Sequence, residues 1–172
     1  MHQLVSSIAS HSINLPDYTE SAEAEYNQKL TNQLHGLCMD ANNIQYGNGM
    51  SKIEFCDVFA PGKKIFHVKK YGGSSVLSHL FSQGYVSAEL LLQDGNFRTA
   101  VRAKLPNGPF RTMIPTTRPN ASDYRIVFVI IGKINVSGKI TLPFFSQVTL
   151  RRHYKQLTSY NYKVYVNYVS HG

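Results

Sequence analysis

Asp57, His67 and Lys69 are the residues of this sequence whose types and spacing best suit chemistry on a phosphodiester. They lie in two segments, 53–59 and 64–70, that have the composition of β-strands and are separated by a loop of hairpin length. Side chains alternate along a strand, so His67 and Lys69 share one face, and antiparallel pairing can place Asp57 on that face too. The pattern predicts an acid, an imidazole and an ammonium in one patch.

Such a patch holds the groups that metal-assisted phosphodiester hydrolysis needs. A carboxylate anchors a hard divalent ion, which polarises a phosphate and lowers the pKa of a bound water, and a lysine stabilises the charge that develops on phosphorus. Glu25, in the preceding segment, could supply a second carboxylate. The alternative is a hairpin with ordinary solvated polar side chains, because a spacing of this kind often arises by chance.

Alternating helices and strands would position this patch. Residues 1–19 are expected to form an N-terminal arm, and residues 20–172 a single domain. Helices are predicted at 19–35, with Thr19 as N-cap, at 75–92, where Gly84 could split the helix, and at 147–159, capped by Ser146. Further strands are predicted at 37–44, 124–131 and 162–169, a strand or strand-helix hybrid at 97–105, and a proline-rich loop at 106–119. This order indicates an α/β fold with a mixed central sheet flanked by helices, in which 124–131 is covered on both faces.

The composition excludes several classes of protein. With 172 residues, 42% of them hydrophobic and 16% charged, the chain is a folded domain and neither disordered, coiled-coil nor collagen-like. No apolar run is long enough to span a bilayer, and the first residues lack the pattern of a secretory signal. We therefore expect a cytoplasmic protein with no membrane partner, in which Cys38 and Cys56 are reduced thiols.

The charge is unevenly distributed along the sequence. Residues 1–57 hold seven acids and two lysines, whereas residues 58–172 hold sixteen lysines or arginines and three acids. A basic surface of this size favours a polyanionic partner, because each neutralised phosphate releases counterions. Nucleic acid, and DNA in particular, is the expected partner, and the early acids would hold a metal ion inside the basic groove. The alternative is a basic protein whose charge only keeps it soluble and binds no partner.

Several residues are candidates for contact with a nucleic acid backbone. The glycines before Ser74 and Ser75 open a predicted helix, whose free main-chain amides can bind a phosphate. The remaining candidates are cations in a predicted strand, loop and helix: Lys70, Arg111, Arg118, Arg151, Arg152 and Lys155. The last three could equally form a solvated helix face. RNA binding through exposed tyrosines Tyr162, Tyr165 and Tyr168 is a further alternative, although packing would explain their pattern equally well.

The order of these residues resembles the PD-(D/E)XK nucleases, the restriction-endonuclease-like fold. The likeness rests on a helix with Glu25, a strand with Asp57, a strand that ends in an x-x-K motif, and a helix with Gln83. It implies that Asp57, Glu25 and His67 would be ligands of Mg²⁺ or Mn²⁺ and that Lys69 would be the catalytic lysine. His67 stands where the family has Glu or Asp, and imidazole suits Mn²⁺ better than Mg²⁺. On this basis His67→Glu is expected to raise magnesium-dependent cleavage.

A longer likeness covers roughly residues 18–169. Three segments are similar to the C-terminal part of a sporadically distributed bacterial family of unknown function, which is associated with mobile or defence loci. The segments are IEFCDVF, HVKKYGGSSVLSHLFSQGYVSAELL and LPFFSQVTLRRHYKQL. The two resemblances together imply a DNA-binding, metal-dependent endonuclease in genome defence, as a homodimer or with further defence subunits. The alternative is a catalytically degenerate nuclease fold that serves as a nucleic-acid-binding or assembly module.

Overall fold

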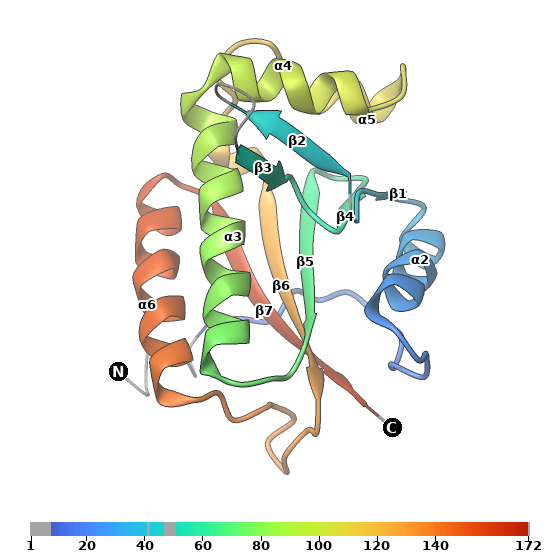
Figure 1. Cartoon of the computed structure of the whole chain (residues 1–172), viewed down its shortest axis with the longest axis vertical. Helices are drawn as coiled ribbons and strands as arrows, with labels where there is room; N and C mark the ends of the chain where they lie inside the picture. Colours follow the sequence, from blue (N-terminus) through green and yellow to red (C-terminus); the bar gives the residue numbers. More distant parts are fainter. Residues whose placement is uncertain (1–7, 41, 47–50, 172) are drawn as a thin grey trace.

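A computed structural model describes residues 8–40, 42–46 and 51–171 of the chain, arranged as one mixed sheet with helices on both faces (Figure 1). The expectation of an α/β fold with a mixed sheet flanked by helices is confirmed. In chain order the elements are α2 (Glu23–Leu34), β1 (Leu37–Cys38), β2 (Asn43–Tyr46), β3 (Ser51–Glu54), β4 (Val58–Ala60), β5 (Lys64–Lys70), α3 (Ser74–Gln93), α4 (Gly95–Lys104), α5 (Pro109–Thr112), a 3₁₀ turn (Ala121–Asp123), β6 (Arg125–Gly132), α6 (Phe144–Ser159) and β7 (Lys163–Ser170).

The main sheet has five strands in the order β1-β4-β5-β6-β7. The first three are antiparallel neighbours, with Val58 of β4 opposite Phe66 of β5, as the hairpin spacing predicts. Strands β5, β6 and β7 are parallel, because α3 and then α6 carry the chain back across the sheet. A separate antiparallel hairpin, β2 and β3, lies beside α4 near one end of the sheet (Figure 1).

The larger apolar core lies between the sheet and the α3–α6 layer. Along β6 the burial is continuous from Ile126 to Gly132, which is the pattern of a central strand covered on both faces. Residues of β6 that face α3 include Phe128, whose ring meets that of Phe81 at 5.3 Å. The sheet and the two long helices, α3 and α6, therefore form two packed layers that support any site on the strands.

The opposite face of the sheet is covered by α2 and by the N-terminal segment. Tyr26 and Leu30 of α2 are fully buried there, and Tyr18 is buried beside them. The preceding residues hydrogen-bond to the far edge of the sheet, where the Val166 amide donates to the Ala9 carbonyl at 3.1 Å and the amide of Asn167 donates to the His11 carbonyl at 3.1 Å. The N-terminal segment thus packs along β7 and supports the sheet from behind.

Residues 95–104 form a helix, so the expectation of a strand or hybrid at 97–105 is wrong. The Asp94 carboxylate accepts a hydrogen bond from the Phe97 amide at 3.0 Å and caps the helix. Phe97 and Val101, one turn apart, are both fully buried. The cap and the four-residue spacing were present in the sequence, but the aromatic and β-branched residues of the segment favoured the prediction of a strand.

Other element boundaries differ from expectation. Helix α3 runs unbroken through Gly84, which is buried against Phe128 and contributes a close approach of helix and sheet. Helix α2 begins at Glu23 and α6 at Phe144, so Thr19 and Ser146 are not their caps. The Ser146 hydroxyl, inside α6, instead donates to the Ser74 carbonyl at 3.0 Å. None of the described helices is long and apolar enough to cross a membrane.

Candidate functional site

The candidate site lies at the end of β5, where β4 no longer pairs with it. Within the described residues, β4 pairs with β5 only as far as Phe66, which leaves the following amides of β5 at an open edge. Two carboxylates fill that edge: the Asp57 carboxylate accepts from the Val68 amide at 2.6 Å, and Glu23 accepts from the Lys70 amide at 2.6 Å. Acidic side chains here take the place of a paired strand. Their carboxylates accept the hydrogen bonds of the free main-chain amides, and these bonds fix both carboxylates in position.

Asp57 belongs to a cluster of three carboxylates, which we call the carboxylate cluster: Asp40, Glu54 and Asp57. Their oxygen atoms lie within 4.8 Å of one another, and all three side chains are half-buried. Asp40 follows β1, Glu54 ends β3 and Asp57 precedes β4, so three chain segments converge. A main-chain hydrogen bond of 2.8 Å from the Met39 amide to the Asp57 carbonyl holds two of these segments together.

The electrostatics of the cluster are unfavourable for ionised acids. Burial, together with the charges of Glu54, Asp40 and Glu23, raises the pKa of the Asp57 carboxyl to about 8, against the lowering effect of the Val68 amide. A divalent cation would relieve this repulsion. Three carboxylate oxygens are also a donor set that suits the hard ions Mg²⁺, Mn²⁺ and Ca²⁺. The cluster is therefore the place in the described structure with the right ligands for such an ion.

Lys69 lies next to these acids through Glu23. Its ammonium is 3.4 Å from the Glu23 carboxylate, and neither side chain is fully buried. Glu23 therefore contacts both the end of β5 and its lysine, and its charge also acts on Asp57. On the other side of the cluster, the Gln83 amide of α3 donates to the Glu54 carboxylate at 3.3 Å. Asp57 and Glu23 thus contact the end of β5 directly, and Lys69 and Gln83 each contact one of the neighbouring acids.

His67 does not join this group. It is 3% exposed and lies between β5 and α3, with its ring 5.7 Å from that of Phe128 and close to Gly84. Burial lowers the pKa of His67 to about 4, so the imidazole is neutral at pH 7. Its Nε2 atom has no hydrogen-bond partner among the described residues. His67 is therefore a core residue in this structure, and a carboxylate introduced there would be buried among apolar groups.

Glu25 also lies apart from the cluster. It is exposed on the first turn of α2, and its carboxylate accepts hydrogen bonds from the hydroxyl and the amide of Ser21. Glu23, two residues earlier, is the helix acid that reaches β5. Two residues correspond to about 200° around a helix, so only one of the two acids can face the sheet edge.

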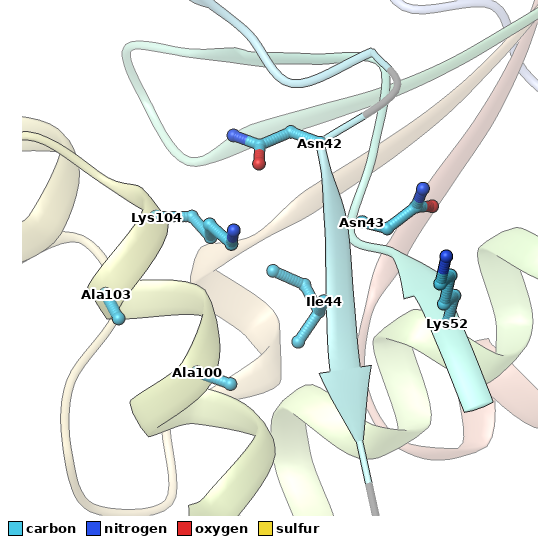
Figure 2. Close-up of a pocket in the computed structure, with 7 residues that line it drawn as sticks. All are labelled: Asn42, Asn43, Ile44, Lys52, Ala100, Ala103 and Lys104. Carbon is cyan, nitrogen blue, oxygen red and sulfur yellow. The ribbon is translucent and has the colours of Figure 1, made fainter. Parts of the chain in front are cut away.

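Two hollows flank the β2–β3 hairpin and share Lys52. One, of about 440 Å³, lies between the hairpin and α4, and Figure 2 shows Lys104 and the small side chains of α4 facing Ile44 of β2 across it. The other, of about 270 Å³, lies between β3 and α3 and is lined by Glu54 and Gln83. The second hollow therefore reaches Glu54 of the carboxylate cluster and is also lined by the exposed Lys52.

The arginines expected to bind nucleic acid in the 106–119 segment differ in exposure. Arg111 is half-buried, and its guanidinium donates to the Leu105 carbonyl, an interaction that holds the segment against α4. Arg118 is exposed and donates to the side chain of Gln93 at 2.9 Å. The most buried cation of this region is Arg98, which donates to main-chain carbonyls at the end of α3.

The other expected contacts are spread over two helices and the end of β5. The Lys70 ammonium lies over the ring of Tyr18 at 5.0 Å, and Ser74 and Ser75 form the first turn of α3. On α6, Arg152 and Lys155 are exposed and Arg151 is half-buried. These residues do not line either hollow beside the carboxylate cluster.

The tyrosines proposed for RNA stacking are packed inside the protein. Tyr162 is buried, and its hydroxyl donates to the Ala88 carbonyl at 2.7 Å. Tyr165 and Tyr168 are half-buried on opposite faces of β7, and His11 of the N-terminal segment contacts the Tyr165 ring edge-on, with the ring centroids 4.8 Å apart. The alternating pattern of β7 therefore reflects packing on both faces, and these rings are not available as an exposed platform.

Four functional candidates escaped sequence reasoning: Glu23, Asp40, Glu54 and Lys52. A signal existed for Glu54, since it lies three residues before Asp57 in the same acidic segment. Asp40 had none, because its proximity depends on the irregular path between β1 and β2. Glu23 and Glu25 could be separated only by knowing which side of α2 faces the sheet.

Comparisons with known proteins give a family and no function. No curated protein matches the chain, and no solved structure does so either. Residues 1–170 match DUF6119, which is described as a family of unknown function. Because this match spans almost the whole sequence, the chain belongs to the DUF6119 family.

Proposed function

We propose that this protein is a DNA-binding, metal-dependent phosphodiester hydrolase of the endonuclease type. The observation that carries the proposal is the carboxylate cluster, in which one oxygen of each acid lies within 4.8 Å of the others and Asp57 binds the open edge of β5. Lys69 is paired with Glu23, the acid that caps the next free amide of the same edge. Half-buried acids without a role would be costly, because burial and then the repulsion of neighbouring acids disfavour an ionised Asp57 and raise its pKa. A bound cation would offset this cost, because it attracts the ionised carboxylates and reduces the repulsion between them.

The chain's own residues divide the work in this proposal. Asp57, Glu54 and Asp40 would hold Mg²⁺ or Mn²⁺, which supplies a polarised phosphate and a water of lowered pKa. Lys69 stabilises negative charge on the phosphate, and Glu23 holds the lysine in place through the 3.4 Å ion pair. Gln83 positions Glu54 by donating to its carboxylate.

The hollows beside the hairpin offer a path for the substrate. Lys52 lines both, and Lys104 lines the larger one together with Asn42 and Asn43 (Figure 2). Ammonium and amide donors of this kind suit the phosphates of a nucleic acid backbone. A DNA strand that follows the hairpin would pass from Lys104 to Lys52 and then reach Glu54 at the cluster.

The order of elements supports a restriction-endonuclease-like assignment, which we include in the proposal. Helix α2 with its glutamate, the antiparallel strands β1, β4 and β5, helix α3 and the parallel strand β6 occur in this order, and Lys69 lies on β5. The hairpin β2–β3 is inserted between β1 and β4, and α4 and α5 are inserted between α3 and β6. The helix acid is Glu23 in place of Glu25. A role in bacterial genome defence is also part of the proposal, and it rests on the sequence resemblance alone.

A catalytically degenerate, binding-only module is the second candidate, and the position of His67 favours it. The resemblance would require a metal-binding carboxylate at that position, and the side chain there is buried among apolar residues. Under this reading the cationic surfaces would bind DNA, and the acids would serve only to cap the edge of β5. Glu54 is the residue that separates the two candidates, because it can replace the missing ligand.

Cleavage of supercoiled plasmid DNA tests the proposal. The wild-type protein should nick plasmid with Mn²⁺ or Mg²⁺ and stop when EDTA is added. Asp57→Asn and Lys69→Ala should each lower the rate by about 10² or more. Glu25→Gln, a matched change of an exposed acid outside the cluster, should leave the rate within about twofold.

Two outcomes would count against the hydrolase. Cleavage that survives EDTA, or that Asp57→Asn leaves intact, would show that the activity does not belong to this site. The binding-only module would be supported if the wild type showed no metal-dependent cleavage but still bound DNA in a salt-dependent way in a gel-shift titration.

A further inference from the structure

Two adjacent phenylalanines at the start of α6 are the most exposed aromatic residues of the described chain. Phe144 and Phe145 keep 62% and 70% of their surface exposed, and their rings lie 5.5 Å apart at 72°. Single exposed apolar residues are ordinary, whereas two large rings side by side on a surface mark a place where something binds. Neither ring takes part in the core.

The phenylalanines share the outer side of α6 with its cations. Residues that face α3 include Ser146, Leu150 and Leu157, which are all buried. Phe144 and Arg151 are seven residues apart, as are Phe145 and Arg152, so each pair lies on one line along the helix with about 10 Å between its members. Lys155 follows one turn after Arg151 and is exposed. In Figure 1, α6 lies at the outer margin of the molecule with α3 as its neighbouring helix.

The charge carried by α6 itself and by the segments before and after it in the sequence has one sign. After Asp123 the sequence has seven lysines or arginines and no acid. None of the ion pairs in the described part of the chain includes Arg151, Arg152 or Lys155. These cations therefore present an unneutralised positive potential next to two exposed aromatic rings.

We propose that the outer face of α6, formed by Phe144, Phe145, Arg151, Arg152 and Lys155, binds single-stranded nucleic acid. Unpaired bases stack on the two rings, and the cations one and two turns further along neutralise the backbone phosphates. Duplex DNA cannot use the rings in this way, because its bases are already stacked on one another. This site is separate from the carboxylate cluster and does not depend on cleavage or on a metal ion.

Other occupants fit this face less well. A membrane-bound helix needs an apolar stripe along its length, and the outer face of α6 is polar beyond Val148. A protein partner would need an acidic surface to complement Arg151, Arg152 and Lys155, whereas every nucleic acid backbone carries that charge. The combination of π surfaces with unpaired cations is the chemistry of single-strand recognition.

Fluorescence anisotropy with a labelled deoxythymidine oligomer tests the proposal in EDTA, so that the carboxylate cluster plays no part. The double variant Phe144→Leu/Phe145→Leu keeps apolar bulk and removes the π surfaces, and it should bind the oligomer at least tenfold more weakly. Phe144→Trp/Phe145→Trp should bind at least as tightly as the wild type. Affinity for a duplex of the same length should change less than twofold in both variants.

The cations have their own readout and a matched control. Lys155→Ala should reduce the slope of log affinity against log salt for the oligomer by about 0.7. Lys163→Ala, an equal loss of charge on β7 away from α6, should leave that slope unchanged. Since all these residues are exposed or half-buried, thermal melting should confirm that every variant is folded.

Three results would overturn the proposal. The first is equal affinity of wild type and the leucine variant for the oligomer. The second is a loss that is the same for oligomer and duplex, which would indicate general electrostatic binding. The third is binding of the wild type to anionic lipid vesicles that the leucine variant retains, with no binding to the oligomer, which would assign the face to a membrane surface.

Discussion

Replacement of His67 by leucine should make the protein more resistant to acid. The wild-type imidazole is neutral and buried, with a pKa of about 4 against 6.5 in the unfolded chain. The unfolded state therefore binds a proton that the folded state refuses as the pH falls from 6.5 to 4. The sign follows from this difference: stability is fully present above pH 6.5 and is lost as the pH falls towards 4.

The magnitude follows from the same two values. A difference of about 2.5 in pKa corresponds to about 3 kcal/mol of unfolding free energy between pH 7 and pH 4. Leucine does not titrate and leaves no buried Nε2 atom without a partner. The His67→Leu variant should therefore equal or exceed the wild type at pH 7, and its advantage should grow by about 3 kcal/mol at pH 4. His67→Glu should instead destabilise the protein at pH 7, because it buries a carboxylate beside Phe128.

Urea denaturation at a series of pH values from 7 to 4 measures this advantage directly. His79→Leu is the matched control, since it removes an exposed imidazole from α3 in place of a buried one. Parallel stability curves for wild type and His67→Leu across this range would refute the burial of a neutral imidazole. Stabilisation of His67→Glu by Mg²⁺ beyond that of the wild type would place residue 67 in the metal site and contradict the structure.

Three further changes test other parts of the structure. Asp57→Asn should raise the melting temperature at pH 8 in EDTA: burial raises the carboxyl pKa from 3.8 to about 8, so its contribution to stability falls as pH rises through that window, and at pH 4 the variant should show no advantage. Gly84→Ala should cost about 1–3 kcal/mol of unfolding free energy in urea, because its Cβ would lie 2.5 Å from the Phe128 ring. Arg98→Ala should cost about 3 kcal/mol by leaving main-chain carbonyls unpaired, whereas exposed Arg118→Ala should cost less than about 0.5 kcal/mol.

The sequence carried the layout of the sheet well. The strand composition of 64–70 and the continuous apolar run of 124–131 identify β5 and β6, and the short 61–63 loop fixes the antiparallel pairing of β4 with β5. These patterns are local in the sequence. The helix at 95–104 was missed although its cap was visible, since a short segment with aromatic and β-branched residues fits both periods.

The candidate site was less accessible to sequence reasoning. Asp57 and Lys69 could be selected from the sequence because Asp57 directly precedes the first strand of the hairpin and Lys69 lies near the end of the second. His67 shares a parity with Lys69, but parity does not say whether α3 covers that face, and here the helix buries His67 where β5 passes beneath Gly84. Asp40 approaches Asp57 through an irregular segment, and no periodicity encodes such a path. Long-range convergence of this kind requires the fold.

The central claim is that Asp40, Glu54 and Asp57 hold a divalent ion, and titration with Mn²⁺ followed by the electron paramagnetic resonance signal of free Mn²⁺ tests it most directly. The wild type should bind Mn²⁺ at pH 8 and more weakly at pH 6, because the ion must displace the proton that burial keeps on Asp57. Asp57→Asn and Glu54→Gln should each weaken binding by about tenfold or more, and Glu25→Gln should bind like the wild type. Binding that is absent from the wild type, or equal in Asp57→Asn and the wild type, would contradict the claim.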